Sequence, residues 1–144
     1  MTRIDAGAVA ERLHAAAIRL IRHVRAADVE SKISPPKLSV LSILAFAGSR
    51  SLTQLAAAEQ VSPPTMSKLI ADLEREGLVS KRADAVDRRG VVILITAKGR
   101  TLMDEGRRRR LALLRRGFVG FTADELKTLS EAAELMLRAT KGDE

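Results

Sequence analysis

The stretch that decides the fold is Ser51 to Thr96, SLTQLAAAEQVSPPTMSKLIADLEREGLVSKRADAVDRRGVVILIT. Its beginning predicts a short helix, because Ser51 and Gln54 have the spacing of a capping box. A second helix is expected after a tight turn, since Ser62 is a favoured N-cap residue and Pro63 suits the first helical position. Two helices joined in this way form a helix-turn-helix.

Two segments rich in β-branched residues follow the second helix. Gly77 ends that helix, and residues 78–82 and 91–96 are predicted to be strands. The loop between them, residues 83–90, is polar and ends in glycine. A two-stranded hairpin is marginally stable alone, so it must pack on the helices. The stretch therefore predicts a helix-turn-helix with a β-hairpin wing.

Apolar residues at helical spacing predict further helices on both sides of this stretch. They cover residues 4–27, 36–47, 97–117 and 122–140. The expected fold is mainly α with a small β-hairpin wing, a winged helix-turn-helix domain carrying helical dimerisation arms. We expect an N-terminal dimerisation helix at 1–33, a winged helix-turn-helix DNA-binding region at 34–99 and C-terminal dimerisation helices at 100–144.

Composition narrows the class of partner. The chain has 144 residues, a net charge of +7 and only 2% aromatic residues. A surface that stacks single-stranded nucleic acid needs exposed rings, so that class is excluded. The positive charge favours a polyanionic partner, although charge alone is also explained by solubility.

Several other classes of function lack their residues. The chain has no cysteine, and His14 and His23 lie on opposite faces of one helix, so neither a disulfide nor a metal site is expected. It has no glycine-rich phosphate loop and no nucleophile elbow, so we expect neither an enzyme nor a cofactor. No segment approaches the ~20 apolar residues of a membrane span. The expected location is the cytoplasm.

The second helix of the motif has the chemistry of a DNA-reading element. A helix in the major groove needs small polar side chains near its N-terminus with a cation beside them. Ser62, Thr65, Ser67 and Lys68 meet that need. The alternative is an ordinary capped amphipathic helix with a solvated face.

The charged loop favours the DNA-binding interpretation. Arg88 and Arg89 at a hairpin tip suit the enhanced negative potential of a narrow minor groove. Asp87 would repel phosphate, so we expect it to pair with one arginine and fix its direction. The alternative is a surface turn, whose ion pairs contribute ~0–1 kcal/mol.

Five motifs occur together in one known family. They are Leu55-Ala56, Val61-Ser62-x-x-Thr65, Leu73-Glu74-Arg75-Glu76-Gly77-Leu78-Val79, Asp87-Arg88-Arg89-Gly90 and Leu94-Ile95-Thr96-Ala97-Lys98-Gly99. With them the chain closely resembles the MarR family of bacterial transcription regulators over nearly its whole length. The resemblance implies a homodimer that binds a pseudo-palindromic operator, commonly as a repressor released by a small-molecule effector.

The resemblance also implies how DNA would be contacted. It places Ser62 to Arg75 in the major groove and the arginine tip in the minor groove, and leaves open which of Arg88 and Arg89 enters. The double proline Pro63-Pro64 departs from the family pattern and leaves fewer polar residues on the first turn. The residues expected to contact DNA are Ser62, Pro64, Thr65, Ser67, Lys68, Arg75, Arg82, Asp87, Arg88 and Arg89.

The outer helices carry the expected dimer contacts. An apolar stripe from Leu126 to Leu137 on the last helix is expected to form an interface, although such a stripe can also be plain core. Arg107 to Arg110 point all round their helix. We expect Arg108 and Arg109 to pair with Asp104 and Glu105, four residues before them, and Arg110 to pair with an acid across the dimer.

An effector pocket is expected from the family resemblance. The resemblance suggests one between the first, second and fifth helices, lined by Leu20, Phe46 and Leu102. His14 is either a contact in that pocket or a helix residue at a packing edge. The pocket can also lack a ligand altogether. Two further alternatives are therefore a regulator without ligand control and a winged-helix interaction module that binds DNA without sequence preference.

Overall fold

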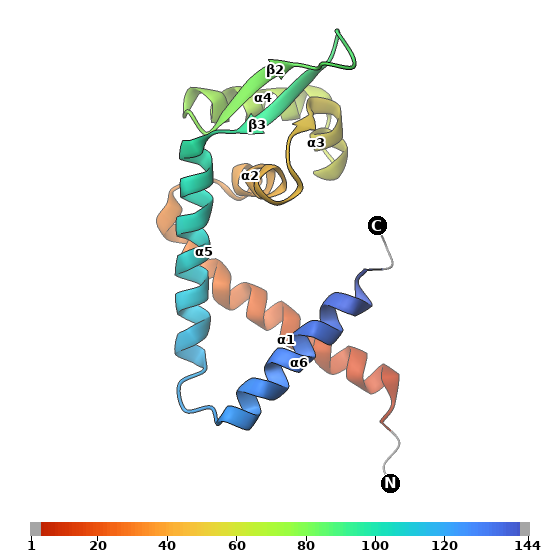
Figure 1. Cartoon of the computed structure of the whole chain (residues 1–144), viewed down its shortest axis with the longest axis vertical. Helices are drawn as coiled ribbons and strands as arrows, with labels where there is room; N and C mark the ends of the chain where they lie inside the picture. Colours follow the sequence, from red (N-terminus) through yellow and green to blue (C-terminus); the bar gives the residue numbers. More distant parts are fainter. Residues whose placement is uncertain (1–3, 142–144) are drawn as a thin grey trace. The chain divides into compact units, whose positions relative to one another are not determined.

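The computed structural model describes residues 4–141, including the side chains of all of these except 29–31. It divides into two compact units, one ending at Arg110 and the other beginning at Leu111 (Figure 1). The elements are α1 (Ala6–Arg25), the 3-10 helix η1 (Ala26–Ser31), α2 (Pro35–Ala47), β1 (Arg50–Ser51), α3 (Leu52–Ala58), α4 (Pro63–Arg75), β2 (Val79–Ala83), β3 (Val91–Ile95), α5 (Ala97–Gly117) and α6 (Ala123–Ala139).

The predicted caps start and stop these helices. Ser51 and Gln54 form the complete capping box of α3, and Ser62 accepts a hydrogen bond from the backbone N–H of Thr65 at the start of α4. After α4, Gly77 has φ +74°, a left-handed conformation that side chains disfavour. Thr122 opens α6 with a second capping box. The helical part of the predicted fold is therefore confirmed.

The sheet has one strand more than predicted. Its order is β1–β3–β2, and both pairs are antiparallel. Ser51 pairs with Val92, and on the other side Lys81 pairs with Ile93. The predicted hairpin is confirmed as β2 and β3. The additional strand β1 was not predicted, because its two residues, Arg50 and Ser51, are too few to show an alternating pattern.

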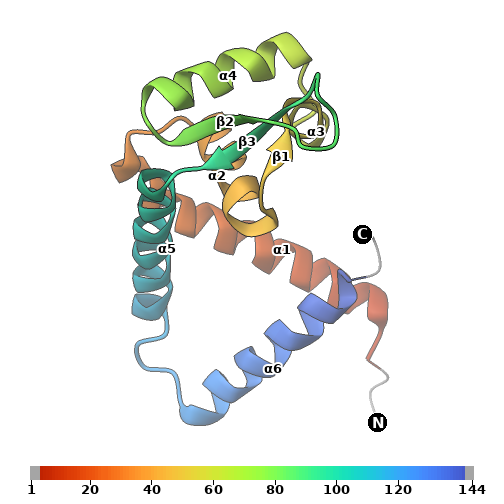
Figure 2. The ribbon, with the colours of Figure 1, turned by 45° about the horizontal axis from the view of Figure 1, so that its top comes forward.

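The core lies between the helix-turn-helix and the sheet. Figure 2 shows α2, α3 and α4 packed around the three strands. Met66, Ile70 and Leu73 recur at helical spacing on α4 and are completely buried, so the inner face of α4 was correctly predicted. The whole core cluster is Val40, Leu41, Leu44, Leu55, Ala56, Met66, Ile70, Leu73, Leu78, Val79, Ile93 and Met103.

The Leu-x-Thr-x-x-Gly motif joins the wing to α5. The Thr96 hydroxyl donates to the backbone oxygen of Gly77 at 2.6 Å and accepts from the N–H of Gly99 at 3.1 Å. A Cβ at Gly99 would lie 2.3 Å from the backbone oxygen of Leu78, closer than any contact allows. Only glycine lets α5 approach the backbone at Leu78, directly before β2, so closely, and this fixes the base of the wing.

The outer helices α1 and α6 contain no buried residue. Large apolar side chains nevertheless lie along each of them, among them Leu20 and Ile21 on α1 and Leu129 and Leu137 on α6. Among the described residues, no helix is long and apolar enough to cross a membrane.

Candidate nucleic-acid interface

The outward face of α4 begins at an exposed proline. Pro64, Lys68, Ala71 and Arg75 follow one another at intervals of four, three and four residues, opposite the buried stripe of the same helix. Pro64, Lys68 and Arg75 are exposed, and Ala71 is half-buried. This outer row is the part of α4 that can approach a groove.

The two hydroxyls of the first turn bind each other. Ser62 Oγ and Thr65 Oγ1 are 2.8 Å apart, and Ser62 Oγ also accepts from the Thr65 N–H at 3.3 Å. One of the two hydroxyl hydrogens is used in their mutual contact, whichever oxygen donates. The pair therefore has one hydroxyl hydrogen left to offer a ligand.

Most charges on and beside α4 are paired locally. Arg75 forms an ion pair with Asp72, and Lys81 Nζ lies 3.6 Å from Glu74 Oε1. Lys68 has no ion pair within the described part of the chain. Its charge is thus the one on α4 that no neighbour offsets.

The wing tip is shaped by its aspartates. Asp84 Oδ1 accepts from the backbone N–H of Val86 at 2.9 Å, and Asp87 Oδ1 accepts from that of Arg89 at 3.0 Å. The expected pairing of Asp87 with an arginine side chain was wrong, since the carboxylate binds backbone instead. Carboxylates often bind an N–H two residues ahead and so close a turn.

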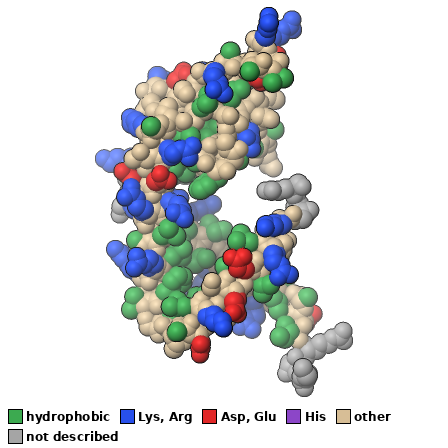
Figure 3. Space-filling view, viewed as in Figure 1, with side chains coloured by type: hydrophobic (Ala, Val, Ile, Leu, Met, Phe, Trp, Pro, Cys, Tyr) green, Lys and Arg blue, Asp and Glu red, His purple; other side chains and the backbone are tan. Residues whose placement is uncertain are grey.

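Because Asp87 binds the backbone, the arginines of the wing keep their positive charge unpaired in the described part of the chain. Arg82, Arg88 and Arg89 form no ion pair among the described residues, and all three are exposed. Figure 3 shows Lys and Arg side chains gathered at the end of the wing. Arginines in such a loop can enter a narrow groove without first breaking a contact.

Long-range polar contacts hold the helix-turn-helix in place. Lys37 on α2 forms an ion pair with Glu76 at the end of α4, and Lys98 Nζ donates to the Glu76 backbone oxygen at 2.8 Å. The Ser39 hydroxyl donates to Glu59 Oε1, at the end of α3, at 2.6 Å. These contacts could not be predicted from the sequence, because Lys37 and Glu76 are 39 positions apart and carry no local pattern.

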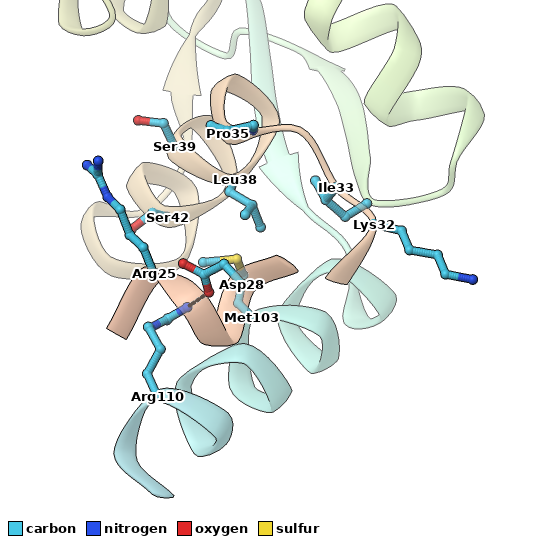
Figure 4. Close-up of a pocket in the computed structure, with 10 residues that line it drawn as sticks. All are labelled: Arg25, Asp28, Lys32, Ile33, Pro35, Leu38, Ser39, Ser42, Met103 and Arg110. Carbon is cyan, nitrogen blue, oxygen red and sulfur yellow. Dashed lines mark hydrogen bonds and ion pairs between the residues drawn. The ribbon is translucent and has the colours of Figure 1, made fainter. Parts of the chain in front are cut away.

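A cavity of about 670 Å³ opens beside α2 within the first unit. Figure 4 shows its lining, with Arg110 pointing to Asp28. The lining residues come from the end of α1, from η1, from the loop after it, and from α2 and α5. They are Arg25, Asp28, Lys32, Ile33, Pro35, Leu38, Ser39, Ser42, Met103 and Arg110.

The four predicted effector contacts do not line this cavity. His14 is exposed on α1, Leu20 is 49% exposed and Phe46 is 72% exposed. Leu102 packs against the core cluster. These residues thus lie outside the lining of the cavity beside α2.

Arg110 has its partner in its own chain. Its Nη1 lies 2.6 Å from Asp28 Oδ1, and Arg109 Nε donates to the Ala27 backbone oxygen at 3.3 Å. The expectation of an acid across the dimer was therefore wrong for Arg110. No ion pair joins Arg108 or Arg109 to Asp104 or Glu105 among the described side chains, so the expected pairs along α5 were wrong as well.

No cluster of three or more metal-binding side chains occurs among the side chains that the structure describes. The interface consists of a partly apolar helix row, one lysine without a described ion pair, and a cationic wing. These are groups that bind a polyanion.

Comparisons with known proteins agree with this geometry. The sequence model of the MarR family matches residues 33–91. The HTH-type transcriptional regulator ML2140 of Mycobacterium leprae is 33% identical over 129 residues, which are 90% of this chain and 90% of that protein.

Two solved structures share the fold. The transcriptional regulator Tm0710 from Thermotoga maritima has a TM-score of 0.80 at 21% identity, over 92% of this chain and 96% of its own. A MarR family protein from Bacillus stearothermophilus has a TM-score of 0.77 at 22% identity, over 95% of this chain and 98% of its own. At these identities the likeness shows the fold alone.

Proposed function

The chain belongs to the MarR family of helix-turn-helix transcriptional regulators, and we propose that it is a homodimeric repressor that binds a pseudo-palindromic operator. The observation that carries this proposal is the wing, whose three arginines Arg82, Arg88 and Arg89 are exposed and have no ion pair among the described residues. In the proposed complex α4 lies in the major groove and the wing tip in the adjacent minor groove.

Dimerisation is proposed because one helix-turn-helix reads only half of a palindrome. Two copies must present their α4 helices about 34 Å apart to read successive major grooves. The apolar stripes of α1 and α6 are the surfaces that support this assembly, since each helix has no buried residue of its own. Operator DNA lies in the bacterial cytoplasm, which is therefore the proposed location.

The effector site is proposed in the cavity beside α2. Arg25 extends next to Ser39 and Ser42 there, and the Asp28–Arg110 ion pair forms one wall (Figure 4). An anionic molecule would bind Arg25 and compete with Asp28 for Arg110. An effector that instead contacts His14, Leu20, Phe46 and Leu102 would need a second site.

The function is tested by fluorescence anisotropy with the chain's own upstream intergenic DNA and a scrambled duplex of equal length, at physiological salt. A sequence-specific regulator is expected to prefer the operator by ~10³-fold or more. Equal and strongly salt-dependent binding to both duplexes, with no preferred site recovered by genomic selection, would indicate a non-specific winged-helix module and overturn the proposal.

Lys68 offers an internal check on the same titrations. Because its charge is not offset by a neighbour, Lys68→Ala is expected to lower the slope of log affinity against log salt by about one. Lys127→Ala, on the exposed side of α6 and paired with Glu131, is the matched control and should leave the slope unchanged.

A further inference from the structure

The first turn of α4 has few backbone donors left for DNA. Helix N-termini commonly bind phosphate through their four free N–H groups. Of the four groups at this helix end, Pro63 and Pro64 have no N–H and the Thr65 N–H binds Ser62 Oγ, which leaves the N–H of the N-cap residue Ser62. The Met66 N–H binds the Ser62 backbone oxygen at 3.0 Å within the helix. Phosphate binding by several backbone N–H groups together is therefore excluded at this helix end.

Few side-chain donors lie beside Pro64: the exposed Ser67 hydroxyl, about 60° round the helix, the Lys68 ammonium one turn further on, and the two hydroxyls before them. Ser62 and Thr65 have one hydroxyl hydrogen between them, as their mutual contact uses the other. Further along, Arg75 is already paired with Asp72. What the outer row presents first is the pyrrolidine ring of Pro64, an exposed apolar surface next to Lys68.

The base edges in the major groove offer one apolar group that an apolar side chain can contact. The base edges there carry hydrogen-bond donors and acceptors, except for the C5-methyl group of thymine. The ring of Pro64 can exclude water from that methyl group without leaving a donor unpaired. Against a polar edge the same ring would remove water and supply no replacement.

We propose that Pro64 reads the 5-methyl group of one thymine in each half-site of the operator. This assignment rests on the proposed function and names the feature of the DNA that the first turn of α4 recognises. Lys68, one turn along the same row, would hold the neighbouring backbone phosphate or guanine edge. Specificity at this position then comes from an apolar contact and not from a hydrogen bond.

Deoxyuridine provides the test, because it lacks only the methyl group of thymine and keeps its base pairing. Each thymine of the operator half-sites is replaced by deoxyuridine, in symmetric pairs, and affinity is measured by anisotropy. One symmetric pair is expected to weaken binding of the unaltered protein about fourfold per half-site, or about fifteenfold in all, the effect of one buried methyl group. Pro64→Ala, whose single methyl group reaches less far than the ring, should show a clearly smaller difference between the thymine and deoxyuridine operators.

Pro63→Ala is the matched control. It also removes a ring and restores an N–H in the first turn, but residue 63 lies about 100° round the helix from residue 64, toward the core side. Its sensitivity to deoxyuridine is expected to stay at about fifteenfold. Circular dichroism of both variants confirms that α4 still forms.

The possible outcomes are distinct. The preference for the operator over the scrambled duplex is measured first, and this measurement alone tests the proposed function. If the preference holds but no deoxyuridine pair weakens binding, the assignment of Pro64 is wrong. It is equally wrong if Pro64→Ala retains the full sensitivity of the unaltered protein.

Discussion

The inner face of α4 and the apolar stripe of α6 have similar sequence patterns and opposite surroundings. Ile70 and Leu73 on α4 are completely buried, whereas Leu126 and Leu129 on α6 are each 42% exposed. Both patterns are amphipathic helices with leucine at helical spacing. The difference is that α4 packs against its own sheet and α2, while α6 has no buried residue. An apolar stripe predicts that a partner exists but does not identify it.

The largest effect is expected inside the closed core. Leu73→Ala leaves a cavity among residues that are fully buried, so it should lower the free energy of unfolding by about 2–5 kcal/mol. Urea unfolding at fixed protein concentration measures this. The control is Leu135→Ala on α6, where the side chain is 58% exposed and the expected change is within about 0.5 kcal/mol. Equal losses would contradict the contrast between the two helices.

The next effect concerns association. Leu129→Asp puts a charge on the α6 stripe and is expected to raise the dimer dissociation constant tenfold or more, since about 1.4 kcal/mol suffices for that change. Sedimentation velocity over a dilution series would report it. Leu135→Asp, about 120° round the same helix from Leu129 and 58% exposed, is the control. Unchanged sedimentation of the Leu129 variant would show that α6 is not an interface.

A smaller effect is expected at the end of the first unit. Arg110→Ala removes the ion pair with Asp28, whose side chain is 25% exposed, and should lower stability by about 1 kcal/mol. A double-mutant cycle with Asp28→Asn isolates the pair. Because the pair lies within one chain, dimer dissociation should not change. A weaker dimer with unchanged stability would restore the idea of a contact across the interface.

The smallest effect on stability is expected at the wing. Arg89→Ala should change the free energy of unfolding by less than about 0.5 kcal/mol, since the side chain is exposed and has no described ion pair. Operator affinity should fall nonetheless, with Arg88→Ala measured alongside to show which arginine enters the groove. If both substitutions leave affinity unchanged, the wing does not contact DNA.

Much of the helical framework could be predicted because its signals are local. Ser51, Ser62 and Thr122 cap the helices that follow them, and α5 spans the predicted residues 97–117. Each signal involves residues three or four apart, a distance over which side chain and backbone meet as soon as a helix forms. The third strand was not predictable, because two residues of extended chain have no pattern of their own.

The candidate site also has one part that the sequence predicts and one part that depends on tertiary contacts. Sequence by itself placed Lys68, Arg88 and Arg89 on a recognition helix and a wing, because motif order and residue type are enough for that. Only the tertiary structure decided which charges are already used. Arg110 meets Asp28 across 82 positions, and Glu76 receives Lys37 across 39. Such contacts depend on how α2, α4 and α5 pack, and no spacing along the chain encodes that packing.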